Sequence, residues 1–181
     1  MRIEDWLSWQ ILKILDEIMS AFKPQITKRG DLPHLTFIKR KPEPLGTEMK
    51  AAADTATRIT LYLEIQKGKE VMENEEFTDI CSKVTSACTK RLVKYSSRKF
   101  QEIENEGLEY TETWLGNAWF ASVQTAIQVS EFGHFIGPVK CSHSLYPKKW
   151  IRDTMEKWPG GSYIVLESNI EGVDLLAVGY K

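Results

Sequence analysis

The stretch Ile59-Thr-Leu-Tyr-Leu-Glu-Ile65 decides the fold class, because apolar side chains occupy its first, third, fifth and seventh positions. A period of two predicts a β-strand with one apolar face. Residues 47–53 precede it and are expected to form its partner, joined through a turn at residues 54–57. The chain is therefore expected to contain a sheet that includes this hairpin.

A helical pattern follows at residues 77–95, where apolar side chains recur every three or four positions. The members of its apolar face are Phe77, Ile80, Cys81, Val84, Ala87, Cys88, Leu92 and Tyr95. Cys81 and Cys88 are then small buried hydrophobes rather than metal ligands. The opposite side carries Lys83, Lys90 and Lys94, which predicts a solvated face, with contact to phosphate groups as the alternative.

In the rest of the chain, segments with the period of two typical of strands alternate with segments that have the spacing of three or four typical of helices. Strands are expected at residues 110–115 and 132–141, a helix after residue 118, and a hairpin from strands 162–167 and 173–180. A further helix is expected after Pro147, with these side chains turned inward: Trp150, Ile151, Met155 and Trp158. The order predicts a mixed α/β sheet covered by helices. Residues 4–22 have helical spacing, so periodicity alone predicts a helix there.

Composition limits the classes of protein to consider. A chain of 181 residues with 42% hydrophobic side chains is expected to form one domain with a real core. No apolar run approaches the roughly 18 residues that span a bilayer, so no membrane segment is expected. Three cysteines without paired spacing favour reduced thiols in an intracellular protein. The net charge of −1 gives no support to a free-standing nucleic-acid binder.

Most kinds of metal site and catalytic site are disfavoured, because the sequence lacks their motifs. Cys141 and His143 have no second pair of ligands, so a zinc site is not expected. The glycines do not form a phosphate-binding loop, and the serines do not lie in a nucleophile elbow. Carboxylates remain, chiefly Asp16-Glu17 at the end of an apolar run. Such a pair is more often a solvated turn or a helix-end charge than a site.

Several stretches together resemble the transposase domain of piggyBac-type elements. They are Leu15-Asp-Glu-Ile-Met-Ser-Ala-Phe-Lys-Pro24, Lys41-Pro-Glu-Pro-Leu-Gly-Thr-Glu-Met-Lys50, Leu61-Tyr-Leu-Glu-Ile-Gln-Lys-Gly-Lys-Glu70, Asn117-Ala-Trp-Phe-Ala-Ser122, Phe135-Ile-Gly-Pro-Val-Lys-Cys-Ser-His-Ser144 and the terminal hairpin. The similarity covers roughly residues 15–180, with residues 1–181 expected to be one core fragment.

The resemblance implies a ribonuclease-H-like α/β fold, a mixed sheet flanked by helices with a C-terminal hairpin. It also implies a DDE site of three aspartates that hold two Mg²⁺ ions for DNA strand cleavage and transfer, in a nuclear protein that binds DNA. Asp16 matches the first acid. In the family the motif of this acid lies on a strand, which conflicts with the helix that the spacing of residues 4–22 predicts. Asn117 stands at the second position, and the third acid, expected beyond the hairpin, has no counterpart before Lys181.

The substitution at Asn117 predicts an inactive protein. Mg²⁺ prefers oxygen ligands, and a two-metal site needs carboxylate charge against the repulsion between its ions. Two unit charges about 4 Å apart at a dielectric near 20 are worth about 4 kcal/mol. Losing one ligand charge is therefore expected to cost about three powers of ten in affinity or rate. Two alternatives stay open: a domesticated module that binds DNA or a protein, or part of a longer, active DDE transposase.

Overall fold

A computed structural model describes residues 10–21, 35–37, 39, 45–104, 111–140, 143 and 145–181 of the chain. Side chains are described for residues 36–37, 39, 46–97, 112–140, 143 and 145–181. Within these ranges, no helix is both long and apolar enough to cross a lipid bilayer.

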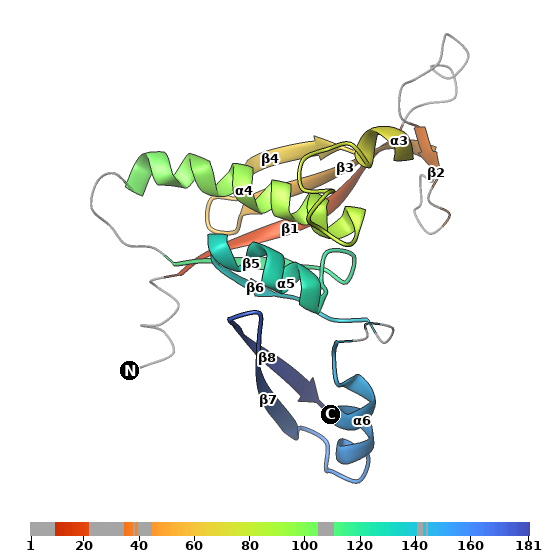
Figure 1. Cartoon of the computed structure of the whole chain (residues 1–181), viewed down its shortest axis with the longest axis vertical. Helices are drawn as coiled ribbons and strands as arrows, with labels where there is room; N and C mark the ends of the chain where they lie inside the picture. The colour runs from red at the N-terminus through yellow and green to blue at the C-terminus, as the bar shows by residue number, and fades with distance from the viewer. Residues whose placement is uncertain are drawn as a thin grey trace.

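The described strands form one large sheet and one separate hairpin (Figure 1). The strands of the large sheet are β1 (Gln10–Ala21), β2 (Leu35–Phe37), β3 (Leu45–Asp54), β4 (Thr60–Ile65), β5 (Thr111–Gly116) and β6 (His134–Ile136). Their order is β2-β3-β1-β5-β6, and β4 also pairs with β3. The β1, β2 and β4 strands are antiparallel to β3, whereas β1, β5 and β6 run parallel to one another. The β1 strand therefore lies at the change from antiparallel to parallel pairing.

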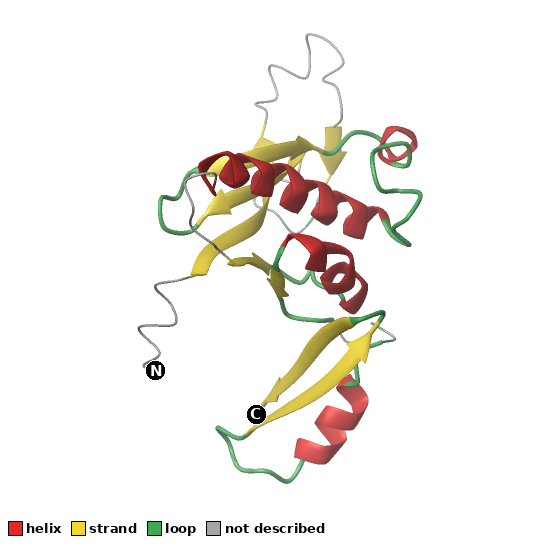
Figure 2. Ribbon diagram, turned by 60° about the vertical axis from the view of Figure 1, so that its left-hand side comes forward, coloured by secondary structure: helices red, strands yellow, loops and turns green. Residues whose placement is uncertain are grey.

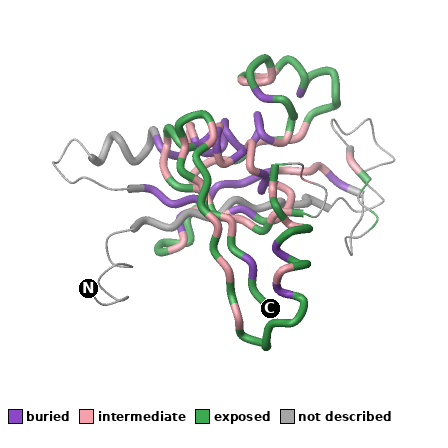
Figure 3. The backbone as a smooth tube through the Cα atoms, turned by 60° about the horizontal axis from the view of Figure 1, so that its bottom comes forward, coloured by how far each residue is buried: buried purple, intermediate pink, exposed green. Residues whose placement is uncertain are grey.

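Helices α4 (Val84–Glu104) and α5 (Val123–Val129) cover one face of this sheet. The other helical elements are α3 (Lys69–Met72), the 3-10 turn η1 (Ser130–Phe132) and α6 (Lys148–Met155). Helices α4 and α5 lie side by side on the same face (Figure 2). The core between them and the sheet comprises Ala52, Cys88, Leu92, Val93, Trp114, Phe120 and Val129. Residues 86–93 of α4 are all buried, so nearly every side of this part of the helix is covered (Figure 3).

The C-terminal part of the chain is a smaller unit built on its own hairpin. Strands β7 (Tyr163–Ile170) and β8 (Val173–Tyr180) are antiparallel, and helix α6 packs against them (Figure 1). Gly179 makes this packing possible, because a Cβ there would lie 2.3 Å from Cγ2 of Ile151. Glu171 and Gly172 both have positive φ angles, 54° and 82°, as a tight two-residue hairpin turn requires.

The helix predicted from the spacing of residues 4–22 is wrong for the described residues of this segment, since residues 10–21 form strand β1. The strand that the resemblance implied there is confirmed. The β1 strand is paired on both edges, with β3 and with β5. A strand inside a sheet can be apolar on both faces, so its apolar residues need not alternate. Tertiary pairing therefore overrides the local periodicity.

Other strands are confirmed, and the apolar face of β4 is the one turned away from α4. Strands β3, β4, β5 and the terminal hairpin lie where the sequence placed them. In β4, however, Leu63 and Ile65 are 48% and 45% exposed. Tyr62 and Glu64 face α4 instead, because the ring of Tyr62 stacks on Tyr95 and the carboxylate of Glu64 binds a helix arginine. The apolar residues of β4 thus lie on the face away from α4.

The helix limits also differ from the prediction. Helix α4 begins at Val84 rather than Phe77, because Phe77 has a φ of 71°, which a right-handed helix excludes. Helix α5 is shorter than its pattern, and strand β6 spans three residues, 134–136. In α6, Ile151 and Met155 are buried as expected, but Trp150 is 53% exposed. Trp158 follows the helix and is 36% exposed, so neither tryptophan enters a core.

Candidate functional site

The two strands that carry the predicted acid positions are neighbours in the sheet. The parallel register of β1 and β5 pairs Gln10 with Thr111 and ends with Leu15 opposite Gly116. Asp16 is the next residue on β1, and Asn117 is the next residue after β5. The fold therefore brings the backbones of Asp16 and Asn117 together at the carboxyl ends of two parallel strands. The side chain of Asp16 lies outside the described part of the chain, so its role as a ligand stays a prediction.

Asn117 organises the turn that follows β5. Its side-chain Oδ1 accepts a hydrogen bond from the backbone N–H of Trp119 at 2.8 Å. Its carbonyl oxygen accepts from the N–H groups of Phe120 and Ala121 at 3.1 and 3.0 Å. Asparagine and aspartate commonly cap turns in this way. The amide oxygen of Asn117 is thus already engaged in local structure, although its side chain is exposed.

A buried lysine lies next to this turn. Lys50, on β3, is fully buried, and its Nζ lies 3.6 Å from the centroid of a Trp119 ring. The ammonium also makes an ion pair with Glu48 on the same strand. In the sheet register Lys50 is opposite Glu17 of β1 and Glu64 of β4. This lysine was not predicted from the sequence, because only the folded sheet brings Trp119 over β3.

The described residues at this edge do not fit a magnesium centre. Mg²⁺ requires oxygen ligands, and a two-metal site requires several negative charges. Asn117 is neutral, and its side-chain oxygen already accepts a hydrogen bond from Trp119. Among the side chains that the structure describes, no group of three or more histidines, cysteines or acids gathers into a possible metal site.

The three lysines predicted to form a solvated face of α4 are placed differently by the structure. Lys90 is only 8% exposed and makes an ion pair of 2.6 Å with Glu131. Lys94 is partly buried, with its ammonium 4.7 Å from the ring centroid of Phe77. The expected solvated stripe is therefore wrong for Lys90 and Lys94, because segment 73–83 and η1 cover that side of the helix. Lys83 is exposed and precedes the first turn of α4.

A second group of basic side chains lies near Lys83. Partial burial, together with the charges of Lys83 and Lys140, lowers the pKa of His143. Lys83 and Lys140 therefore both lie within electrostatic range of His143, although Lys83 is far from the other two in sequence. Lys140 and His143 belong to the stretch 135–144 that carries the resemblance. Their grouping with Lys83 was not predicted, because it depends on the folded arrangement of segments that are far apart in sequence.

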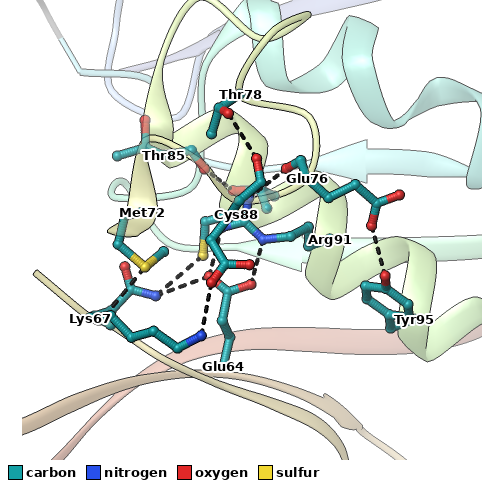
Figure 4. A network of polar contacts seen from close by, with 12 residues as sticks. Glu64, Lys67, Met72, Glu76, Thr78, Thr85, Cys88, Arg91 and Tyr95 are labelled. Carbon is teal, nitrogen blue, oxygen red and sulfur yellow. Dashed lines mark hydrogen bonds and ion pairs between the residues drawn. The ribbon is translucent and has the colours of Figure 1, made fainter. Parts of the chain in front are cut away.

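A network of polar contacts fixes segment 64–78 to α4 (Figure 4). Arg91 donates from Nε and from one terminal nitrogen to the two carboxylate oxygens of Glu64, both at 2.8 Å. Its other terminal nitrogen donates to the backbone oxygen of Glu76 at 2.6 Å. The carboxylate of Glu76 accepts from the Tyr95 hydroxyl at 2.7 Å. These contacts join segment 64–78 to α4 through charged and hydroxyl groups that are each hydrogen-bonded within the network.

A wide cleft of about 1900 Å³ separates the main sheet from the C-terminal unit. Its lining includes β6, α6 and the β7–β8 hairpin, but neither Asn117 nor Lys50. The cleft is therefore distinct from the edge at Asp16 and Asn117.

Comparison with known proteins defines the fold. No protein-family model and no curated protein matches the sequence. A chain of a piggyBac transposase, solved by cryo-electron microscopy in a synaptic complex with hairpin DNA, aligns with 94% of this chain at a TM-score of 0.59 and 17% identity. Endonuclease V of Ciona intestinalis, crystallised with an inosine-containing 23mer DNA, aligns with 88% of this chain and 58% of its own at a TM-score of 0.30 and 12% identity.

The first of these likenesses shows that the chain has a mixed α/β fold of the piggyBac transposase type. The chain spans about 30% of the length of that transposase chain.

Proposed function

We propose that residues 1–181 form a ribonuclease-H-like core of a piggyBac-type transposase, one that contacts DNA without cleaving it. The strand order supports this assignment. Reading β4-β3-β1-β5-β6 across the sheet, the first three strands are antiparallel and the last three parallel, with α4 connecting the two parts. This is the arrangement expected of a ribonuclease-H-like fold. The likeness to the transposase chain supports it independently of the sequence motifs.

The observation that carries the proposal is the adjacency of Asp16 and Asn117. The two positions are 101 residues apart in sequence, by subtraction of their numbers, yet they follow a paired position of neighbouring parallel strands. The carboxyl ends of parallel strands are where α/β proteins commonly build their sites. This supports the assignment of Asp16 as the first acid position and of Asn117 as the second, with its charge lost.

The absence of cleavage follows from the chemistry of the second position. A carboxylate there would supply both a ligand oxygen and a negative charge to Mg²⁺, whereas the Asn117 amide supplies no charge. The hydrogen bond from Trp119 further occupies its oxygen. Mg²⁺, the cofactor that the resemblance implies, is therefore not expected to bind productively here.

Contact with DNA is supported by Lys83 and Lys140, whose charges both act on His143. The ammonium groups of Lys83 and Lys140 attract the phosphate backbone without reading its sequence, whereas the lowered pKa of His143 favours its neutral form. Lys90 and Lys94, the other two lysines predicted to contact DNA, remain weaker candidates, because acidic partners already neutralise them. A DNA-contacting protein of this class would be nuclear, as the resemblance implies.

Fluorescence anisotropy of a labelled DNA duplex at several salt concentrations tests this proposal. We expect measurable binding at low salt whose affinity falls as salt rises. The double variant Lys83→Gln/Lys140→Gln should lower the dependence of log affinity on log salt by about two. Lys69→Gln is a matched control, because this lysine is exposed on α3 and makes an exposed ion pair with Glu73. Undetectable binding by the unmodified chain even at low salt would remove DNA contact from the proposal.

A further inference from the structure

We propose that the face of the β7–β8 hairpin turned away from α6 is a docking surface for a second copy of this chain. Two copies stack these outer faces on each other, with the strands of one copy antiparallel to those of the other. The inference goes beyond the proposed function, because it concerns the C-terminal unit and requires no DNA.

Only one of the two faces of the hairpin is packed against α6. That face carries Gly179, since a Cβ there would lie 2.3 Å from Cγ2 of Ile151 and 3.0 Å from Sδ of Met155 (Figure 1). Successive side chains on a strand point to opposite faces, so Val178 and Tyr180 lie on the outer face. With the partners that the register gives them, the residues of the outer face are Tyr163, Val165, Glu167, Asn169, Asp174, Leu176, Val178 and Tyr180. All of them are exposed, so no described segment packs on this face.

The outer face exposes an unusually large apolar area. The exposed fractions of its apolar and aromatic residues are 68% for Tyr163, 44% for Val165, 68% for Leu176, 56% for Val178 and 78% for Tyr180. An aromatic side chain presents about 150–250 Å² and an aliphatic one less, so these residues together expose roughly 600 Å². A contiguous patch of that size is at the upper end of what monomers expose and is often an interaction site.

The area is sufficient for a contact between two copies. Two outer faces that cover each other bury roughly 1200 Å² in total, above the approximately 1000 Å² that a specific interface needs. Stacked sheets pack about 10 Å apart with their strands nearly aligned, a geometry that a flat two-stranded face can adopt with its own copy. The net charge of −1 on the whole chain leaves little repulsion between the copies.

The position of the charges on the outer face favours antiparallel stacking. Its acids, Glu167 and Asp174, lie toward the β7–β8 turn, whereas the pair of Tyr163 and Tyr180 lies at the other end. In antiparallel stacking Asp174 of one copy lies opposite Tyr180 of the other, whose hydroxyl can donate a hydrogen bond to it. Parallel stacking would instead place carboxylates opposite carboxylates. The apolar centre of the face, which contains Leu176, is covered in either orientation.

Sedimentation velocity of the full chain at about 1–100 μM tests the inference. We expect a monomer–dimer equilibrium. Leu176→Lys places an ammonium from each copy in the centre of the contact and should raise the dissociation constant of the dimer at least about tenfold. Circular dichroism establishes that the variant is folded. If it is not, Val178→Thr provides the test, since a hydroxyl buried in the contact should also raise the dissociation constant.

Leu63→Lys is the matched control. Leu63 is also an exposed leucine on a strand, but it belongs to β4 of the large sheet. Its replacement should leave the dissociation constant of the dimer unchanged.

Pulsed electron paramagnetic resonance measures the orientation, with a nitroxide on Glu171→Cys in a Cys141→Ser background. Cys81 and Cys88 are buried, so they should not react with the label. The label lies in the turn at one end of the hairpin. Because a strand rises about 3.3 Å per residue, antiparallel stacking should separate the two labels by about 30 Å, and parallel stacking by only about 10 Å.

Three results would overturn the inference. A chain that stays monomeric over the whole concentration range would assign the outer face to a different partner. An equal loss of association in Leu63→Lys and Leu176→Lys would show that the contact is not specific to the hairpin. Labels about 10 Å apart would exclude antiparallel stacking. None of these results concerns DNA, so the anisotropy measurement tests the proposed function separately.

Discussion

Leu15 on β1 pairs with Gly116 on β5, and both strands run in the same direction. The residues that follow this pair, Asp16 and Asn117, are therefore neighbours along the carboxyl ends of the two strands. Gly116 is required for the packing at this point, because a Cβ there would lie 2.8 Å from Cζ of Phe135 and 3.0 Å from Cβ of Phe120. The position of Asn117 is thus set by the packing beneath it.

Asn117→Asp is expected to preserve the turn, because a carboxylate accepts the Trp119 N–H as an amide oxygen does. Asn117→Ala removes the acceptor and should lower the free energy of unfolding by about 1 kcal/mol. Urea unfolding followed by circular dichroism measures both. Equal stability of the alanine and aspartate variants would show that the 2.8 Å contact does not hold the turn.

Replacing Arg91 with methionine should destabilise the protein strongly. Arg91 is 3% exposed, and its removal leaves the Glu64 carboxylate, whose side chain is 12% exposed, without its charged partner. Loss of one member of a buried pair typically costs about 3–5 kcal/mol. A double-mutant cycle with Glu64→Gln measures the coupling between the two residues. If the two single-variant effects simply add, the network in Figure 4 does not act as a unit.

Stability should fall in alkaline solution because of Cys88. Burial raises the pKa of its thiol above the ordinary value of 9.0, so the folded chain favours the neutral form. This contribution is fully present below about pH 9 and is lost as pH rises toward the folded-state pKa, by up to about 1.4 kcal/mol for each pH unit. Unfolding between pH 8 and 10 should show a shallower decline in Cys88→Ala. An unchanged slope in that variant would contradict the assignment.

The turn between β7 and β8 offers a stabilising substitution. Glu171 adopts a φ of 54°, which non-glycine side chains adopt at a cost, and asparagine tolerates better than glutamate. Glu171→Asn should therefore raise the thermal midpoint of unfolding. Gly172→Ala should lower it, and since nothing lies within 4 Å of a Cβ at Gly172, backbone strain is the cause. A higher midpoint for Gly172→Ala would show that this turn does not adopt a positive φ.

Sequence patterns predicted the elements whose structure depends mainly on residues close to one another in the chain. Strand β4 and the terminal hairpin follow from a period of two and from turn residues, which act within a few positions. Strand β1 was not predictable by period, because its apolar residues do not alternate although it pairs with β3 and with β5. The start of α4 was missed because Phe77 has a positive φ that its residue type does not suggest.

The candidate site was predictable in its positions but not in its charges. Motifs at Asp16 and Asn117 indicated two positions that the sheet does bring together. The burial of Lys50 and the ion pair of Lys90 depend on neighbours supplied by distant segments, Trp119 and Glu131. Periodicity assigns a lysine to a surface by default, so it cannot predict a lysine that the fold buries.

Incubation of the intact chain with supercoiled plasmid in Mg²⁺, analysed by gel electrophoresis, tests the central claim most directly. We predict that the plasmid is retarded by binding at low salt and stays supercoiled after the protein is removed. Nicked plasmid that requires Mg²⁺ and disappears in Asp16→Ala would contradict the account, because it would show that this core still assembles a working metal site.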